Sequence, residues 1–253
     1  MGEVARAREL IEQAVACAIQ SEDVPSKVNV YVRQAALETI RGDAEAVLPV
    51  AGTLVELCQE DGLAQWLAWG NTRRGWAKAR LGGRDVGVRE MREGIAVLAE
   101  QESKLYMPFI QGLLADIESE IGESALSRID GALALATETG ERWSDSFLHR
   151  IRGEILLKLD PANAAAEQAF RAALAVGQAQ KARSFELQAA LGLAKFYQST
   201  ARLADARGVL ASALGGFSRT PEMPEIAEAQ ALLERLAGSG EGAISATGPA
   251  TQG

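Results

Sequence analysis

The sequence predicts an all-α fold, a right-handed α-solenoid of about five helix pairs with a further helix at each end. The first observation behind this prediction is a regular series of turn signals. Glycines stand at positions 2, 42, 82 and 122, and later turn signals follow at Asp160-Pro161 and Thr200-Ala201. The interval between successive signals stays at 38 to 41 residues. Such a period is typical of helical hairpins that stack, because one hairpin alone cannot bury its apolar face.

Two series of small residues keep the same period. One lies seven residues before each turn, at Ala35, Gly75, Ala115, Gly153 and Ala194. The other lies in the following helix, as a small residue, a large one four positions on and a small one three further: Gly87/Met91/Gly94, Ala125/Ile129/Ala132, Ala166/Phe170/Ala173, Ala206/Leu210/Ala213 and, as a weaker copy, Ala46/Val50/Thr53. Small side chains at fixed offsets indicate helices whose backbones approach closely.

The small-large-small spacing is that of tetratricopeptide repeats, lengthened here from the usual ~34 residues to about 40. The extra length corresponds to longer helices in each pair. HEAT-type repeats match the length, but they give no reason for small residues at fixed offsets. The pattern therefore favours a repeat that resembles the tetratricopeptide repeat (TPR).

The elements follow from these signals in order. In the fourth pair, Leu148, Ile151 and Ile155 form one apolar stripe, and Pro161 then separates this helix from the next. Residues 1–237 would form one repeat domain and 238–253 a disordered tail, since the latter are small residues without a pattern. Within the domain we expect a lone helix at 2–20, pairs near 25–60, 64–102, 104–139, 142–180 and 182–217, and a capping helix at 224–237.

The last helix has the pattern of a cap. It begins at Pro224, which suits a first helical turn, and ends before Gly238. Its apolar stripe consists of Ile226, Ala229, Leu233 and Leu236. We expect its polar residues to face solvent, as a terminal repeat requires: Glu225, Glu228, Glu234 and Arg235.

The opening helix differs, because the helix that would pair with it has no counterpart before Gly2. Part of its apolar set, which comprises Leu10, Ile11, Val15 and Ala18, should then stay partly exposed. Either this helix caps the array, or it frays, or it pairs with another copy of the chain, giving a homodimer through the N-terminal end, or with preceding sequence. We favour the interpretation that the array is a piece of something longer.

Composition limits the partners. A net charge of −8 argues against nucleic acid and against anionic membranes, since both need clustered Lys and Arg. No apolar run reaches the ~18 residues of a membrane helix, and the N-terminal segment lacks the hydrophobic core of a signal peptide. We therefore expect a cytoplasmic protein. Cys17 and Cys58 lie about one repeat apart, which predicts small buried side chains at equivalent positions.

Motifs for catalysis are absent from the sequence. It has no phosphate-binding loop, no GxSxG elbow and no HExxH, and the glycine-rich segment 82–87 lacks the Lys-Ser/Thr of a phosphate loop. His149 is the only histidine, which excludes histidine-rich metal sites. We therefore expect no enzyme activity, no catalytic or metal-binding residues and no cofactor.

One helical stripe stands out. Trp66, Trp69, Arg73 and Trp76 lie within an arc of about 80° at ~100° per residue. Indole rings beside a guanidinium can form a recognition surface for a carboxylate or a stacked group. Alternatively, the tryptophans pack between helices while Arg73 snorkels, so that its guanidinium reaches solvent. Both interpretations stay open on the sequence alone.

Six segments carry a resemblance to a known family: 65–70 (QWLAWG), 74–77 (RGWA), 139–143 (TGERW), 148–157 (LHRIRGEILL), 169–174 (AFRAAL) and 220–233 (TPEMPEIAEAQALL). These segments resemble the C-terminal repeat region of large bacterial signalling proteins. In that family an adenylate or guanylate cyclase domain, or a helix-turn-helix output domain, precedes a predicted ATPase and then TPR-like repeats. The chain lacks the cyclase and ATPase modules, so the resemblance supplies no catalytic residues.

These inferences lead to one expected function and one alternative. The first is a non-enzymatic scaffold or sensor that binds a protein, peptide or small effector and regulates a linked or partner signalling domain, either a cyclase/ATPase or a transcriptional output. The alternative is a free-standing TPR adaptor for an unrelated protein complex. The sequence does not identify the ligand, because one repeat architecture serves many partners.

Overall fold

The computed structural model describes residues 4–21, 23–161, 163–217 and 224–241. Every regular element in these ranges is a helix. The α-helices are α1 (Val4–Gln20), α2 (Val24–Ile40), α3 (Ala44–Glu60), α4 (Ala64–Arg80), α5 (Arg84–Glu100), α6 (Met107–Ile117), α7 (Glu123–Thr139), α8 (Asp145–Leu159), α9 (Ala164–Ala179), α10 (Arg183–Ser199), α11 (Leu203–Leu214) and α12 (Pro224–Glu241). A short 3₁₀ helix, η1 (Ser119–Ile121), lies before α7.

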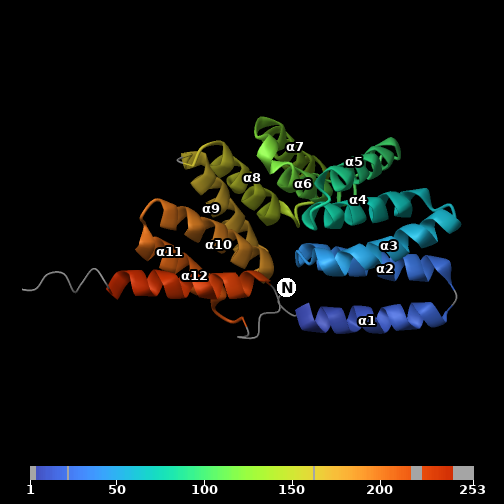
Figure 1. Cartoon of the computed structure of the whole chain (residues 1–253), viewed down its shortest axis with the longest axis horizontal. Coiled ribbons are helices and arrows are strands. Elements are labelled where there is room, and N and C mark those ends of the chain that lie inside the picture. Colours follow the sequence, from blue (N-terminus) through green and yellow to red (C-terminus); the bar gives the residue numbers. More distant parts are fainter. Residues whose placement is uncertain (1–3, 22, 162, 218–223, 242–253) are drawn as a thin grey trace, which may run out of the picture.

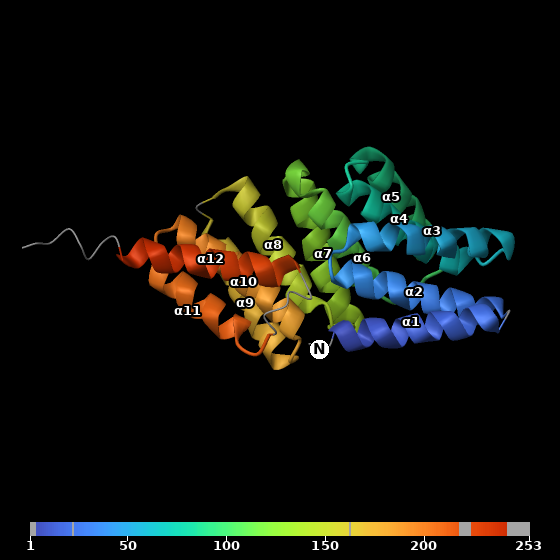
Figure 2. The same ribbon diagram turned by 60° about the horizontal axis from the view of Figure 1, so that its bottom comes forward.

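The helices form two layers (Figures 1 and 2). The first helices of the pairs, α2, α4, α6, α8 and α10, contact one another in sequence and continue to α12. The second helices, α3, α5, α7, α9 and α11, contact first helices and not one another. The first helices therefore form a continuous inner layer, and the prediction of an all-helical, solenoid-like array is confirmed.

The turns between the two helices of a pair lie where the glycines predict them. Gly42 and Gly82 adopt φ values of 75° and 98°, a left-handed conformation that costs glycine little. Gly122 also has a positive φ, while Gly2 lies outside the described residues. In the last pair Ala201 takes this conformation without glycine, at φ 58°.

The small residues mark close approaches of backbone, as expected. A Cβ on Gly87 of α5 would lie 2.3 Å from the carbonyl oxygen of Gly75 and 2.6 Å from the amide nitrogen of Ala79, both on α4. Real Cβ atoms do not approach backbone this closely, so only glycine fits at this crossing. The other residues that precede the turns by seven positions are buried as well: Ala35, Ala115, Gly153 and Ala194.

The helix α3 departs from the predicted pattern. Its buried residues include Val47, Ala51 and Leu54 at the spacing of the pattern, so the weaker copy at Ala46/Val50/Thr53 is wrong by one residue. The reason is that α3 and α5 both begin two residues after their turn glycine, so Val47 stands where α5 has Gly87. At this pair the array therefore uses a large-small-large stripe.

The ends differ from expectation in three places. The last helix continues to Glu241 instead of ending before Gly238, because a glycine lowers helix stability by only ~1 kcal/mol and does not end a helix by itself. The remaining tail, 242–253, lies outside the described residues. In α12, Leu232 is buried rather than Leu233. Cys17 is exposed while Cys58 is buried, since the residue 40 positions before Cys58 is Ala18.

Candidate functional site

The tryptophan stripe of α4 lies mostly inside the protein. The side chains of Trp69, Arg73 and Trp76 are 4%, 3% and 2% exposed, and Trp66 is half-buried. Trp69 packs in a core cluster with residues of α2 and α3, while Trp76 belongs to the cluster shared by α4, α6 and α8. The four residues thus share one helix face, as predicted, but other helices cover three of them.

Arg73 is a buried cation, and no carboxylate of the described residues is its partner. Its guanidinium lies 5.3 Å from the ring centroid of Trp69, and Nη1 donates a hydrogen bond of 3.3 Å to the Trp69 carbonyl. Its Nε has no hydrogen-bond partner, and no carboxylate of the described residues forms an ion pair with it. Burial lowers the pKa of Arg73 to about 10, an effect that nearby Tyr106 partly offsets. The tryptophans thus pack between helices, as the second interpretation of the sequence has it, but its expectation that the Arg73 guanidinium reaches solvent is wrong.

The tryptophans continue into a chain of aromatic rings along the inner layer, here called the aromatic belt. The ring of Trp69 meets Tyr106 at 5.1 Å between centroids, and Tyr106 meets Trp143 at 5.7 Å. Trp143 then meets Phe109 at 5.0 Å, from which the belt continues through Phe147 to Phe185. A cross-repeat spacing in the sequence could have revealed the belt: positions 69, 106 and 143 lie 37 apart, and 109, 147 and 185 lie 38 apart.

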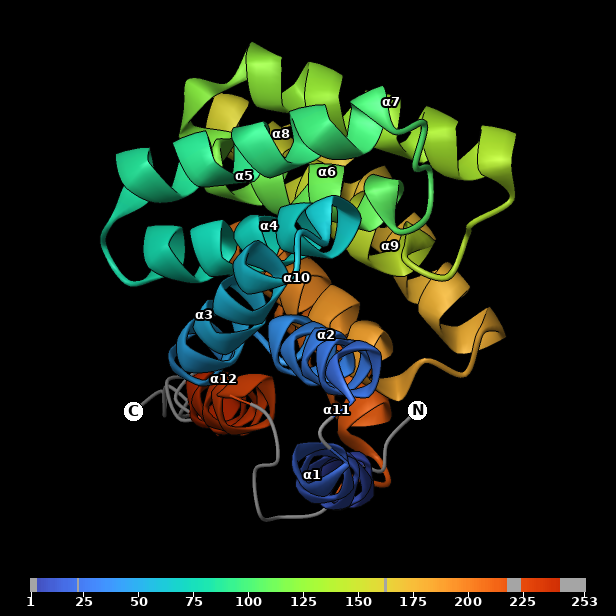
Figure 3. The ribbon, with the colours of Figure 1, turned by 90° about the vertical axis from the view of Figure 1, so that its right-hand side faces the viewer.

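A small cavity, here called the central cavity, lies where the inner helices converge. The N-terminal end of α12 returns to the turn between α2 and α3, and a Cβ on Gly42 would lie 4.0 Å from Oε1 of Glu225 (Figures 1 and 3). The enclosed volume is about 40 Å³, enough for roughly three water molecules. Its walls combine the aromatic residues Trp76, Phe109, Phe147 and Phe185 with the polar residues Arg80, Asp116, Arg150, Gln188 and Glu225.

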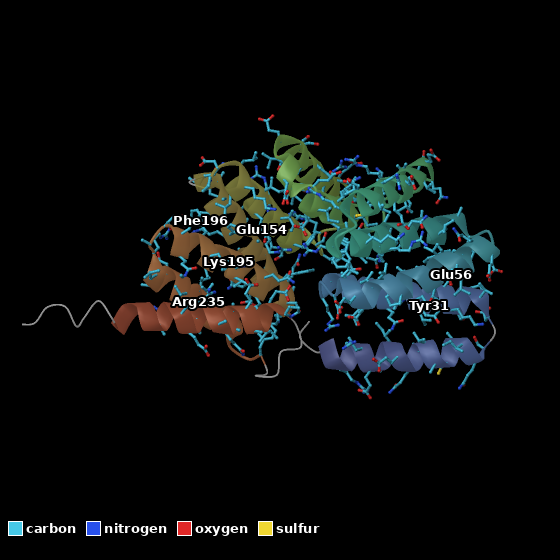
Figure 4. The ribbon with its side chains drawn as sticks, viewed as in Figure 1. Tyr31, Glu56, Glu154, Lys195, Phe196 and Arg235 are labelled. Carbon is cyan, nitrogen blue, oxygen red and sulfur yellow. The ribbon has the colours of Figure 1, made fainter. Side chains whose placement is uncertain are left out.

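The charged and amide side chains that line this cavity come from five different helices. Arg80 of α4 lies 3.7 Å from Asp116 of α6, and Gln188 of α10 donates a hydrogen bond of 2.8 Å to Glu225 of α12. Arg150 of α8 pairs with Glu154 of the same helix at 2.6 Å (Glu154 is labelled in Figure 4). Burial, together with the negative charge of Glu154, raises the pKa of Asp116. The expectation that Glu225 faces solvent is wrong, because it forms part of this cavity.

Three buried polar atoms of the cavity-lining residues have no hydrogen-bond partner among the described residues. They are Nε1 of Trp76, Nε of Arg150 and Oε2 of Glu225. The first two are donors and the third is an acceptor.

Other chemistry has little support in the described part of the chain. No group of three or more His, Cys, Asp or Glu side chains there could hold a metal ion. His149 lies half-buried on α8, where burial lowers its pKa. None of the described helices is both long enough and apolar enough to cross a membrane.

Comparison with known proteins gives no assignment. No family model matches the chain, and no curated protein matches it.

Proposed function

We propose that this protein is a non-enzymatic scaffold or sensor module, a right-handed superhelix of TPR-like repeats whose inner surface binds a protein, a peptide or a small effector. In a bacterial cytoplasm it would regulate a linked or partner signalling domain, either a cyclase/ATPase or a transcriptional output. The repeat spacing supports the TPR-like assignment, and the resemblance of segments such as 148–157 supports the signalling context.

The observation that carries the binding proposal is the set of unpartnered polar atoms on residues that line the central cavity. A buried polar atom without a hydrogen bond costs about 1–3 kcal/mol, and a core selected only for stability rarely retains several together. Trp76, Arg150 and Glu225 do so at one place. A bound group that forms hydrogen bonds with these atoms would recover this free energy, and the recovered free energy would favour binding at the inner surface.

The side chain that links the cavity to solvent is Arg80. It is about half exposed, its guanidinium lies 5.9 Å from the Trp76 ring centroid, and it pairs loosely with Asp116. A partner that reaches the inner surface would meet this arginine first. Arg80 is therefore the residue whose loss should weaken binding with the least effect on the core.

The test is capture of partners from an extract of the cells that naturally contain the protein. We expect Arg80→Gln to reduce the retained partner roughly tenfold, the effect of losing ~1.4 kcal/mol of binding free energy. Arg89→Gln is the matched control, because Arg89 is exposed on the second helix α5 and does not line the cavity. Equal retention by both variants, or an equal loss in both, would contradict binding at the inner surface.

The alternative function, a free-standing TPR adaptor, would use the same surface. The identity of the captured protein separates the two. A cyclase, an ATPase or a transcriptional regulator supports the signalling role, whereas a partner outside these classes supports the adaptor.

A further inference from the structure

Glu225 connects α12 to the centre of the inner layer. Of the described residues of α12, it is the one that lines the central cavity. Its Oε1 accepts the hydrogen bond of 2.8 Å from Gln188 of α10, and a Cβ on Gly42 would lie 4.0 Å from the same oxygen. Among the described helices α12 packs only against α10 and α11, so its approach to the turn between α2 and α3 depends on this side chain.

The carboxylate of Glu225 is held incompletely. One oxygen accepts from Gln188, whereas Oε2 is buried and has no hydrogen-bond partner among the described residues. An ionised carboxylate can accept about four hydrogen bonds, and those from charged donors are the strongest. The hydrogen bond to Glu225 comes from a neutral amide. Glu225 is therefore a weakly held occupant of a buried position, and another carboxylate can compete with it.

Donors that Glu225 does not use are present on other residues that line the cavity. Nε1 of Trp76 and Nε of Arg150 are buried and have no partner in the described part of the chain. The Nη1 of Arg150 already pairs with Glu154. The pKa of Arg150 is raised, because burial, which lowers it, is outweighed by nearby carboxylates that include Glu225. Glu225 thus acts on Arg150 through its charge, and the lining residues offer more donors than it uses.

Space and charge in the cavity favour the exchange of one carboxylate for another. With Glu225 in place the free volume is about 40 Å³, too small for a partner's side chain beside it. The charged residues that line the cavity are two cations and two anions: Arg80, Arg150, Asp116 and Glu225. Without the Glu225 carboxylate the balance is one positive charge, which favours an anion. The Glu225 side chain is partly exposed, and rotation about its own bonds can carry the carboxylate to solvent while α12 stays in place.

We propose that Glu225 is an internal ligand of a carboxylate-binding site, and that a partner docks by replacing it with a carboxylate of its own. The replacing group belongs to an acidic side chain or to a C-terminus of the partner. This inference rests on the proposed function, since it names the group that the inner surface binds. Because Glu225 belongs to the same chain, it competes at every protein concentration, and the apparent affinity falls with the fraction of time that the site is free. The contact is thus autoinhibitory.

The first test follows the indole N–H signal of Trp76 by nuclear magnetic resonance, with Trp76→Phe to assign it. The probes are acetyl-Ala-Glu-Ala-amide, with a side-chain carboxylate, and acetyl-Ala-Ala-Ala, with a free C-terminal carboxylate. In Glu225→Ala we expect at least one of them to bind about tenfold more tightly than in the parent, the gain from freeing a site that Glu225 occupies for ~90% of the time. The peptide that binds more tightly identifies the source of the carboxylate. Acetyl-Ala-Gln-Ala-amide should not shift the signal.

The matched control is Glu228→Ala, which removes the same charge from the same helix one turn further on. Glu228 pairs with Lys195 at an exposed position and does not line the cavity, so this variant should bind the peptides like the parent. Adding Gln188→Leu to Glu225→Ala should abolish the gain, because it removes a donor of the site. Circular dichroism checks that the variants stay helical. Equal binding by the Glu225 and Glu228 variants, or binding of the glutamine peptide as tight as that of the acidic ones, overturns the proposal.

The second test repeats the capture of partners with Glu225→Ala. This variant should retain more partner than the parent, whereas Arg80→Gln should retain less. Retention that depends on Arg80 but not on Glu225 overturns the internal-ligand proposal and leaves the proposed function in place. Retention that depends on neither residue contradicts the proposed function itself, and the peptide titration then decides separately whether Glu225 occupies a carboxylate-binding site.

Discussion

Replacing Gly87 with alanine should lower the free energy of unfolding by about 2–3 kcal/mol, the cost of overpacking a tightly packed site. The added Cβ would stand 2.3 Å from the Gly75 oxygen and 2.8 Å from the Ala79 Cβ, so α4 and α5 would have to move apart. Because the nearest atoms belong to backbone, a side-chain rotation cannot relieve the contact. Thermal unfolding should show the midpoint falling by roughly 5–10 °C.

The matched control for this substitution is Gly131→Ala on α7. Gly131 is exposed in the middle of a helix, and a Cβ there would meet nothing within 4 Å. Alanine should then raise the free energy of unfolding by about 0.5–1 kcal/mol through its better helix propensity. If both variants changed stability in the same direction and by the same amount, the close crossing of α4 and α5 would not be a determinant of the fold.

Arg73→Met should stabilise the protein, by about 1–3 kcal/mol at neutral pH, although it removes a hydrogen bond and a cation–π contact. Among the described residues the guanidinium is buried without a carboxylate, and burial lowers its pKa to about 10, a shift that corresponds to roughly 3 kcal/mol. Methionine fills a similar volume without a charge. The measurement is urea unfolding of both proteins, with Arg89→Met as a control at an exposed position.

The same substitution has a defined pH dependence. The folded-state pKa of Arg73, about 10, lies below its unfolded value, so the unfolded chain binds more protons than the folded protein as the pH rises above about 10. The cost of the buried charge is fully present below pH 10 and disappears as the pH rises through that range. The stability advantage of Arg73→Met should therefore shrink above pH 10. An advantage that is absent at neutral pH, or that grows with pH, would show that the guanidinium is not penalised by burial.

The sequence predicts those parts of the fold that depend on local pattern. Turn glycines such as Gly42 need a left-handed backbone, and the small residues Gly75 and Gly87 report a close crossing, so each leaves a signature readable within one repeat. The register of α3 could not be read in this way, because Val47 and Leu54 replace the small residues of the pattern. In α3 the small-large-small order of the other repeats is reversed, and the small residue, Ala51, lies between the two large ones.

The central cavity could be predicted only in part. Three of its aromatic residues, Phe109, Phe147 and Phe185, repeat at 38 residues, but the position of Glu225 depends on how far the array curves before α12 meets the turn at Gly42. That curvature results from the small rotations between all successive helix pairs, and no single residue pattern encodes it. For the same reason the stripe of α4 could be recognised, while the burial of Arg73 within it could not.

The account rests on one claim, that the inner layer of first helices binds the partner. Hydrogen–deuterium exchange of the protein alone and saturated with its captured partner tests this most directly. We predict slower exchange in α4, α6, α8 and the N-terminal half of α10, which surround the central cavity, and unchanged exchange in the second helices α5, α7 and α9. Protection confined to the second helices, with the inner layer unaffected, would contradict the claim.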